Sequence, residues 1–336
     1  MKWHRRVLFL LLVIATFAGI MELLRTCFSL PQKSGHERTA TRLYSKRNNT
    51  KKCPSTFGRV AVFAAYSGNR VERLYEIAQQ SLQCYLKGMD YSLFFVDLDN
   101  DELVQRACGM HGIAYFKKHC AARLYLPQTD WLLVLDADTG VVNPNHCIEE
   151  WIDDRVDVIL YERFWNWEIM AGNYLVRNSE FGDKFLDDWA NFDSLLPASY
   201  NGYDQGALMM LLLKTLIPES EIEYNACEEY LINATSFNTY MAVVYCVRQA
   251  LGATRMWPGK IRIFRRFEAF ARDGFVTEQR WSDKDFMIHG WKNVDLNGTA
   301  FEENLELSLC DQGLRAWEVA WRKDLKMEVH ELRYEI

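Results

Sequence analysis

Short apolar runs alternate with amphipathic stretches along the chain. Five of the runs have the length of buried β-strands: residues 60–66, 91–96, 113–116, 131–135 and 156–161. Between them, residues 71–87 and 102–109 place apolar side chains at helical spacing. Because strands alternate with helices, we predict an α/β fold with a mostly parallel sheet that helices cover on both faces. Ligands of such sheets bind beyond the carboxyl ends of the strands.

The pattern becomes less regular in the second half of the chain. Residues 181–193 have the spacing of an amphipathic helix, with Phe185, Leu186 and Trp189 on its apolar side. Residues 216–280 follow neither the helical nor the strand period clearly, so we expect an irregular or helical elaboration there.

The N-terminus begins with basic residues and continues into an uninterrupted apolar run over 7–21. As a helix this run spans about 22 Å, which a thin early-secretory bilayer tolerates. The run is either an uncleaved signal anchor or a cleaved signal peptide. We favour the anchor because no good cleavage site follows. We therefore predict a cytoplasmic tail and anchor over 1–28, a basic stem over 29–57 and a luminal domain over 58–336. A cleaved leader would make this domain secreted.

Composition adds a charge asymmetry to this picture. The chain has 336 residues, and its 49% hydrophobic and 14% aromatic content excludes general disorder. Residues 1–60 carry 12 Lys and Arg against two Glu, so the formal charge of −6 divides into +10 there and −16 over 61–336. An acidic body argues against nucleic-acid binding, which needs a concentrated basic surface.

Cysteines and glycosylation sequons fit a luminal body. There are nine cysteines. Setting aside Cys27, next to the apolar run, leaves enough for up to four disulfides, whose pairing the sequence leaves open. No Cys and His cluster has zinc spacing. Three N-x-Thr sequons occur, at Asn48, Asn233 and Asn297.

The most informative segment is the apolar run 131–135 with the two carboxylates that follow it. Asp136 and Asp138 lie at i and i+2, so extended backbone would point both to one side at the end of the strand. Hard oxygen ligands in this arrangement suit Mg²⁺ or Mn²⁺. Asp97 and Asp99 also follow a strand, but the polar residues after them favour an ordinary solvated turn.

The segment from Tyr125-Leu126-Pro127 to Asp138 resembles glycosyltransferases of the A fold, in particular the Golgi galactosyl-, mannosyl- and xylosyl-transferase family. Glycogenin-like transferases are more weakly similar. The resemblance implies a GT-A type, Rossmann-like fold in which Asp136 and Asp138 hold Mn²⁺, or Mg²⁺, on a nucleotide-diphosphate sugar, most commonly a UDP-sugar. It also implies that Arg123 lies near this donor.

Three later segments extend the resemblance, which covers about residues 60–215 and 283–292. Residues 169–179 are similar to the family's Asn-x-Gly-x-Phe-Leu-Ile-Arg-Asn segment, although Met170 replaces its Asn and Asn173 is the substitute candidate for a sugar contact. The helix opening at Asp204-Gln205 resembles a segment that orients donor sugar and acceptor. The resemblance assigns His289 as the third metal ligand and Lys292 as a diphosphate contact.

These matches imply a type II membrane glycosyltransferase of the Golgi or endoplasmic reticulum that retains anomeric configuration and acts on a glycan or glycoprotein. The donor sugar, the acceptor linkage and the oligomeric state stay open. One alternative is a haloacid-dehalogenase-like phosphatase, which also places D-x-D after a strand. The other is a luminal carbohydrate-binding pseudoenzyme, in which some of five tryptophans would stack on sugar: Trp165, Trp167, Trp257, Trp281 and Trp291.

Overall fold

A computed structural model describes residues 53–68, 74–87, 89–292 and 296–332. The predicted tail, anchor and nearly all of the stem lie outside these residues, as do Cys27 and Asn48. No helix within the described ranges has the length and apolarity that a bilayer crossing requires.

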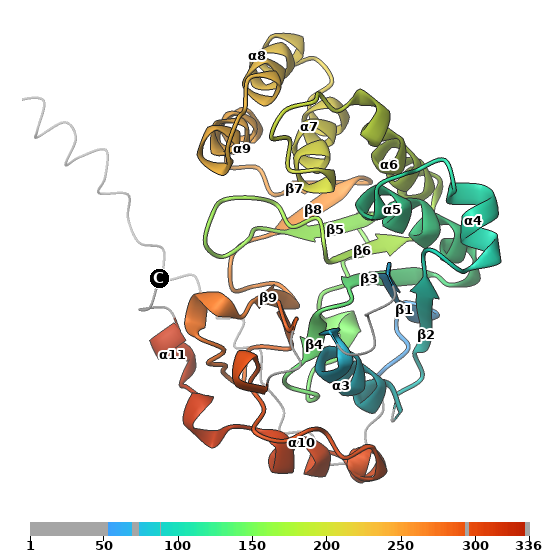
Figure 1. The fold of residues 1–336 in the computed structure, drawn as a ribbon, viewed down its shortest axis with the longest axis vertical. Helices are drawn as coiled ribbons and strands as arrows, with labels where there is room; N and C mark the ends of the chain where they lie inside the picture. Colours follow the sequence, from blue (N-terminus) through green and yellow to red (C-terminus); the bar gives the residue numbers. More distant parts are fainter. Residues whose placement is uncertain (1–52, 69–73, 88, 293–295, 333–336) are drawn as a thin grey trace, which may run out of the picture. The chain divides into compact units, whose positions relative to one another are not determined.

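A seven-stranded sheet forms the centre of the described structure (Figure 1). Its strand order is β2-β1-β3-β6-β5-β8-β7. Five of these strands run in one direction, while β6 and β7 run antiparallel to their neighbours. The mostly parallel sheet is therefore confirmed. The strands are β1 (Val60–Tyr66), β2 (Ser92–Asp97), β3 (Trp131–Asp136), β5 (Val158–Tyr161), β6 (Tyr174–Arg177), β7 (Met256–Trp257) and β8 (Ile261–Phe264).

Both faces of the inner strands of this sheet are buried, as the near-continuous apolar runs predict, whereas the edge strands β2 and β7 are only partly buried. Along β1, Phe63 packs into one core cluster and its neighbour Val62 into the other, because successive side chains of a strand point to opposite faces. The helices are α3 (Glu76–Lys87), α4 (Glu102–Cys108), α5 (Ala114–Tyr125), α6 (Glu180–Ala190), α7 (Asp204–Leu216), α8 (Glu221–Ile232), α9 (Phe237–Leu251), α10 (Arg315–Ala320) and α11 (Val329–Leu332).

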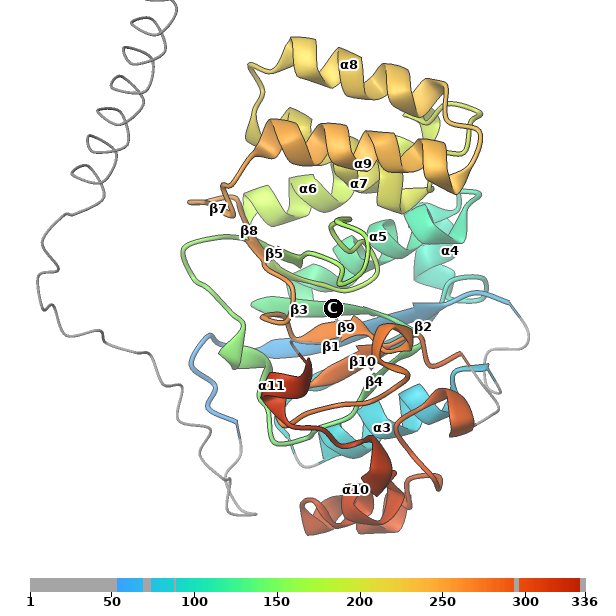
Figure 2. The same cartoon turned by 90° about the vertical axis from the view of Figure 1, so that its left-hand side faces the viewer.

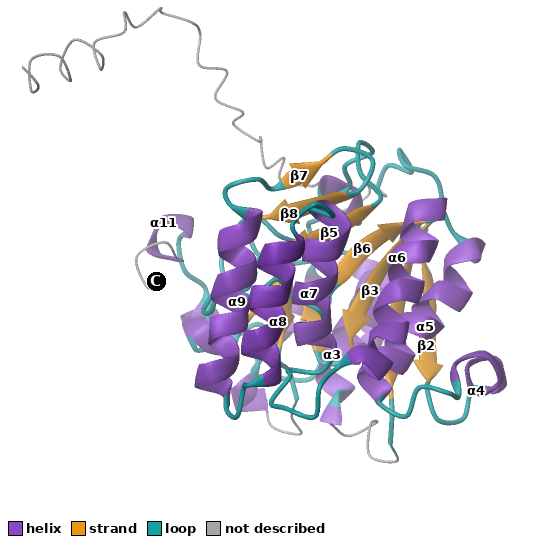
Figure 3. Ribbon diagram, turned by 90° about the horizontal axis from the view of Figure 1, so that it is seen from above, coloured by secondary structure: helices purple, strands orange, loops and turns teal. Residues whose placement is uncertain are grey.

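The helices form layers on either side of the sheet. Helices α5 to α9 cover one face, and α8 and α9 lie outermost (Figures 2 and 3). Helices α3 and α10 lie on the other side, together with a second, small sheet (Figure 2). The helix predicted over 181–193 is confirmed as α6 with a short 3-10 extension, and its predicted apolar side is buried.

One predicted strand is wrong. Residues 113–116 do not form a strand, because α5 begins at Ala114 with Ile113 as its N-cap. The four apolar residues are the first turn of a helix whose buried side continues through Phe116 and Ala122. A run this short fits both periods, so periodicity alone does not distinguish a strand from the first turn of a helix.

The elaboration over 216–280 is helical, as expected, but it also returns to the central sheet. Helices α8 and α9 are followed by β8, which pairs in parallel with β5. The pattern Ile261-Arg262-Ile263 alternates at the strand period and is the local sequence signal for β8.

The small sheet brings the C-terminal segment next to the end of β3. It consists of β4 (Thr139–Val141), β10 (Met287–His289) and β9 (Ala271–Asp273), in the order β4-β10-β9. In its register, His289 lies opposite Thr139 on one side and Asp273 on the other. This pairing brings together residues about 150 positions apart in the chain.

Four disulfides are present among the described residues, as many as the sequence allows. They join Cys53 to Cys147, Cys84 to Cys310, Cys108 to Cys120 and Cys227 to Cys246.

Candidate metal centre

The structure brings the three predicted metal ligands together. Asp136 is the last residue of β3, Asp138 lies in the turn before β4, and His289 is the last residue of β10. One ligand atom from each lies within 4.8 Å of the others. His289 Nε2 is 3.5 Å from Asp136 Oδ2 and 3.5 Å from Asp138 Oδ1. The sequence predicted the members of this cluster, and the small sheet supplies its geometry.

Asn173 fixes the shape of the turn that carries the two carboxylates. Its Oδ1 accepts hydrogen bonds from the backbone N–H of Asp136 and from Thr139 Oγ1, both at 2.9 Å, and its Nδ2 donates to Tyr161 Oη at 3.1 Å. The side chain is fully buried. Asn173 thus positions the turn that carries Asp136 and Asp138, while its sugar contact stays a prediction.

Gly172 lies directly against Asp136. A Cβ atom at this position would be 2.0 Å from Asp136 Oδ2, far inside the distance that real Cβ atoms keep. The glycine in the segment 169–179 is therefore required by the close approach of the backbone to a carboxylate.

A buried lysine, absent from the sequence-based prediction, connects two predicted site residues. Lys118 Nζ is 2.7 Å from Asp136 Oδ1 and 3.7 Å from Asp204 Oδ2. Burial by itself lowers the pKa of Lys118, but the two carboxylates outweigh it and raise the pKa, so the ammonium stays charged. Burial likewise raises the pKa of Asp136, but Lys118 and His289 outweigh it and hold the pKa well below its usual range.

Asp273 is a second residue that the sequence-based prediction missed. Its Oδ1 is 2.9 Å from His289 Nδ1, and Arg163 binds both of its oxygens at 2.8 and 3.1 Å. A carboxylate on the far nitrogen orients a metal-binding imidazole and directs Nε2 toward the ion. Because Asp273 lies in a three-residue strand without an apolar run, no local pattern in the sequence identifies it.

The donor set fits a hard divalent cation. Asp138 is 3% exposed, and its buried Oδ2 accepts no hydrogen bond within the described residues. Lys292 Nζ lies 3.5 Å from this oxygen, beyond good hydrogen-bonding distance. The ion pair with Lys292 offsets part of the cost of burying this oxygen without a short hydrogen bond, and a bound cation would offset more of it. The two carboxylates suit Mn²⁺ or Mg²⁺, and the imidazole favours Mn²⁺, the softer of the two.

The other D-x-D pair forms the ordinary turn that its sequence predicts. Asp97 accepts hydrogen bonds from the backbone N–H of Asp99 and from Asn100. Asp99 accepts from Ser67 Oγ and the Gly68 N–H, both at 2.8 Å. These carboxylates are satisfied by the loops at the ends of β1 and β2.

Asp204 and Gln205 lie at the start of α7, and their side chains form hydrogen bonds with other parts of the protein. Asp204 is the first residue of the helix and not its N-cap. Its Oδ2 is 3.1 Å from Nε2 of buried His119, whose Nδ1 is 2.9 Å from Tyr174 Oη. Gln205 binds the backbone of the segment 169–171, accepting from the Ala171 N–H at 3.1 Å.

Arg123 lies in the last turn of α5, where its guanidinium binds two carboxylates of α6. Its Nε and Nη2 donate to Asp183 at 2.8 and 2.9 Å, and Nη1 donates to Asp187. The structure therefore places Arg123 in an ion-pair network between two helices, and its proximity to a donor stays a prediction.

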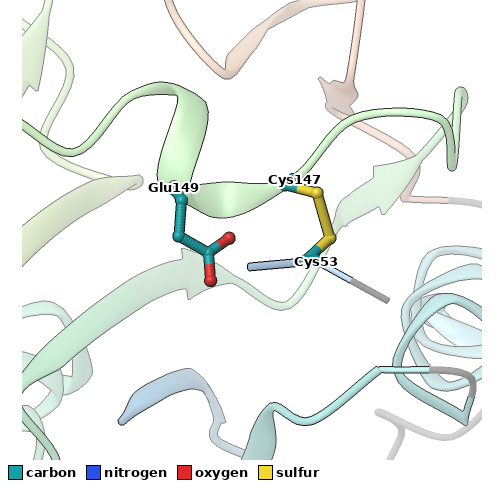
Figure 4. Close-up of side chains that lie close together, drawn as sticks. All are labelled: Cys53, Cys147 and Glu149. Atoms are coloured by element: carbon teal, nitrogen blue, oxygen red, sulfur yellow. A yellow bond between two sulfur atoms is a disulfide. The ribbon is translucent and has the colours of Figure 1, made fainter. Parts of the chain in front are cut away.

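A second group of ligand-type residues is not a metal centre. Figure 4 shows Cys53, Cys147 and Glu149 close together, with a disulfide between the two cysteines. A disulfide has no thiolate to offer a metal. Glu149 instead accepts a hydrogen bond from Tyr91 Oη.

Comparisons with known proteins place the chain in a family. It belongs to the family described as a protein of unknown function, DUF273, whose model matches residues 82–305. A comparison with curated proteins gives no match.

Three similar solved structures are glycosyltransferases, the class that the sequence resembles. One is involved in glycosylation of the major capsid of PBCV-1 (13% identity, TM-score 0.43, 71% of this chain and 97% of that one). Another is the catalytic domain of Drosophila β1,4-galactosyltransferase 7 (13%, 0.27, 39% and 51%). The third is the PaToxG glycosyltransferase (8%, 0.29, 56% and 79%).

Proposed function

We propose that this protein is a metal-dependent glycosyltransferase that uses a nucleotide-diphosphate sugar, most simply a UDP-sugar. The observation that carries the proposal is the convergence of Asp136, Asp138 and His289 at the end of β3, with a buried Asp138 oxygen that no hydrogen bond satisfies. The site lies at the carboxyl end of a strand in a mostly parallel sheet, where ligands of such folds bind.

The residues divide into ligands and supports. Asp136, Asp138 and His289 would hold Mn²⁺ or Mg²⁺, which when bound supplies positive charge that stabilises a departing diphosphate. Lys292 is two-thirds exposed beside Asp138, so its ammonium can donate to a diphosphate oxygen. Asp273 keeps the imidazole of His289 oriented.

A buried network joins this centre to the start of α7. Lys118 pairs with Asp136 and lies near Asp204, so it connects the metal-binding turn to the residues proposed to orient sugar and acceptor. Gln205 fixes the backbone of the segment 169–171 beside the turn. These contacts support a role for Asp204 and Gln205 in shaping the sugar site.

We propose further that the acceptor is a glycan or glycoprotein, and that the N-terminal segment anchors the enzyme in the membrane of the Golgi or endoplasmic reticulum. The four disulfides support an oxidising compartment, where such bonds persist. Sequon residues Asn233 and Asn297 are both exposed, as modification requires. Retention of anomeric configuration rests on the resemblance alone.

The test is a donor screen with the full chain, expressed in secretory cells and purified in detergent. We expect hydrolysis of, or transfer from, one UDP-sugar in the presence of Mn²⁺, and loss of this activity in EDTA. Asp138→Ala should remove the activity, whereas Asp188→Ala, on the exposed side of α6, should keep it. Full activity of Asp138→Ala would contradict the metal role. Hydrolysis of simple phosphoesters without sugar turnover would favour the phosphatase alternative, and sugar binding without any turnover would favour the pseudoenzyme.

A further inference from the structure

Burial separates the five tryptophans that the sequence offers for sugar stacking. Trp281 and Trp291 are 1% and 0% exposed, so they belong to the core. Trp257 is half-buried in the edge strand β7. Only Trp165 and Trp167 are exposed, at 41% and 49%, and both lie in the loop between β5 and β6. Exposed tryptophans this close together are unusual, because indole burial is strongly favourable.

Trp165 forms an aromatic patch with rings from two other parts of the chain. Its ring stacks on Phe237, at the start of α9, with centroids 5.6 Å apart. It also meets Phe275, just after β9, edge to face at 5.8 Å. Phe275 is itself 55% exposed. Segments far apart in sequence thus jointly present an aromatic surface, which we define as Trp165, Phe237 and Phe275.

This aromatic patch is continuous with the candidate metal centre. The Arg163 guanidinium lies over the Trp165 ring, 5.4 Å from its centroid, and also binds Asp273, the carboxylate that holds His289. Phe275 follows Asp273 by two residues. Between them, the Gly274 N–H donates to the His289 carbonyl oxygen at 3.0 Å. The patch is therefore linked to His289 through two intervening side chains, Arg163 and Asp273.

The loop that carries Trp165 contains a residue in an unfavourable backbone conformation. Trp167 has a φ of 62°, in the left-handed region that bulky side chains rarely adopt. Buried Glu168 pairs with Arg163 at 3.4 Å, and the Arg163 N–H donates to the Glu168 carbonyl oxygen at 2.7 Å. Strain that persists because its surroundings enforce it is typical of binding sites.

The chemistry of the patch favours an amphipathic, ring-shaped ligand. A pyranose presents C–H groups on one face, which pack on an aromatic ring, and hydroxyls at its edge, which need polar partners such as the Arg163 guanidinium. We propose that Trp165 and Phe275 bind a sugar residue of the acceptor glycan next to the metal centre. This inference rests on the proposed function, because it assigns the acceptor side of that site.

Binding of the full-length protein to an array of N-glycans, O-glycans, glycolipid headgroups and glycosaminoglycan oligosaccharides tests the inference. We expect a defined subset of glycans to bind. Trp165→Ala and Phe275→Ala should weaken that binding about tenfold or more, as loss of a central aromatic contact does. Trp165→Phe, which keeps an aromatic ring, should retain most of it. Tyr230→Ala, at an exposed aromatic of α8, is the matched control and should bind as the wild type does.

Two further measurements keep the outcomes separate. Mn²⁺-dependent hydrolysis of a UDP-sugar without acceptor reports the proposed function and should be the same in the wild type and in the control variant Tyr230→Ala. If the wild type does not hydrolyse any UDP-sugar but still binds glycans through Trp165, the proposed glycosyltransferase activity is refuted and the sugar-binding site is supported. The inference is overturned if the wild type binds no glycan, or if Trp165→Ala and Phe275→Ala both bind glycans as tightly as the wild type does. So does Trp165-dependent binding to phosphatidylserine vesicles in place of glycans.

Discussion

Gly172→Ala is expected to disable the candidate metal centre although all three proposed ligands are kept. The added Cβ would be 2.0 Å from Asp136 Oδ2, whereas real Cβ atoms essentially never come closer than 3.0 Å. The carboxylate must therefore move by about 1 Å, because the backbone of Gly172 follows the segment that Gln205 holds in place. Bonds from a divalent metal to oxygen are about 2.0–2.6 Å long, so this displacement removes a ligand.

The magnitude follows from the geometry of the centre. Displaced supports of a metal ligand typically cost about 10–100-fold in affinity, or about 1.4–2.7 kcal/mol. The same displacement strains the 2.7 Å pair between Asp136 and buried Lys118. Overpacking of this kind destabilises a fold by about 1–3 kcal/mol, so the unfolding temperature should fall as well.

The assay is titration of the purified full chain with Mn²⁺, followed through the paramagnetic resonance signal of the free ion. Gly112→Ala is the matched control, because a Cβ there meets nothing within 4 Å. It should bind Mn²⁺ as the wild type does. Equal affinity of a folded Gly172→Ala protein would refute the steric reasoning. If neither the wild type nor the control binds Mn²⁺, the assignment of the metal centre itself is wrong.

Three further predictions concern the supports of the site and the fold. Asp273→Asn should lower Mn²⁺ affinity about 10–100-fold in the same titration, because it weakens the hold on His289; unchanged affinity would count against it. Burial lowers the pKa of His119 to about 4, so as the pH falls the imidazole is protonated in the unfolded chain before it is protonated in the folded protein. About 3 kcal/mol of stability should therefore be lost between pH 6.5 and 4, and His119→Gln should flatten that dependence in urea unfolding. Replacing Cys84 and Cys310 by serine should lower the unfolding temperature more than removing the disulfide Cys108–Cys120 between α4 and α5. The first disulfide closes a loop with a sequence separation of 226 and the second one of 12, and a longer loop restricts the unfolded chain more. The reverse order of unfolding temperatures would contradict this chain-entropy reasoning.

The sequence by itself determined the strands β1, β2, β3 and β5 of the central sheet and the helices α3 and α4, but it did not reveal β6, β7 or β8. Apolar runs such as 60–66 and 131–135 can be buried only in a sheet covered on both faces, and their order implies mostly parallel strands. The strand predicted over 113–116 is wrong, because four apolar residues fit either period. The buried side chains that follow in α5 make this segment the start of a helix.

The sequence also predicted Asp136, Asp138 and His289 as one group, because two are adjacent to a strong strand signal and the third lies in a recognisable segment; the structure brings the three side chains together, and their role as metal ligands stays a prediction. The prediction from sequence did not include Lys118 or Asp273. A lysine in a helix and an aspartate in a three-residue strand have no local pattern that separates them from surface charges.

Only the tertiary structure decided which of these groups meet. The register of the small sheet places His289 between Thr139 and Asp273, and the close approach of Gly172 sets the position of Asp136. Local sequence fixes the period of each element, because backbone propensity and side-chain spacing act within a few residues. Contacts between elements 100 or more residues apart depend on how the whole core packs, and the chemistry of this site lies in those contacts.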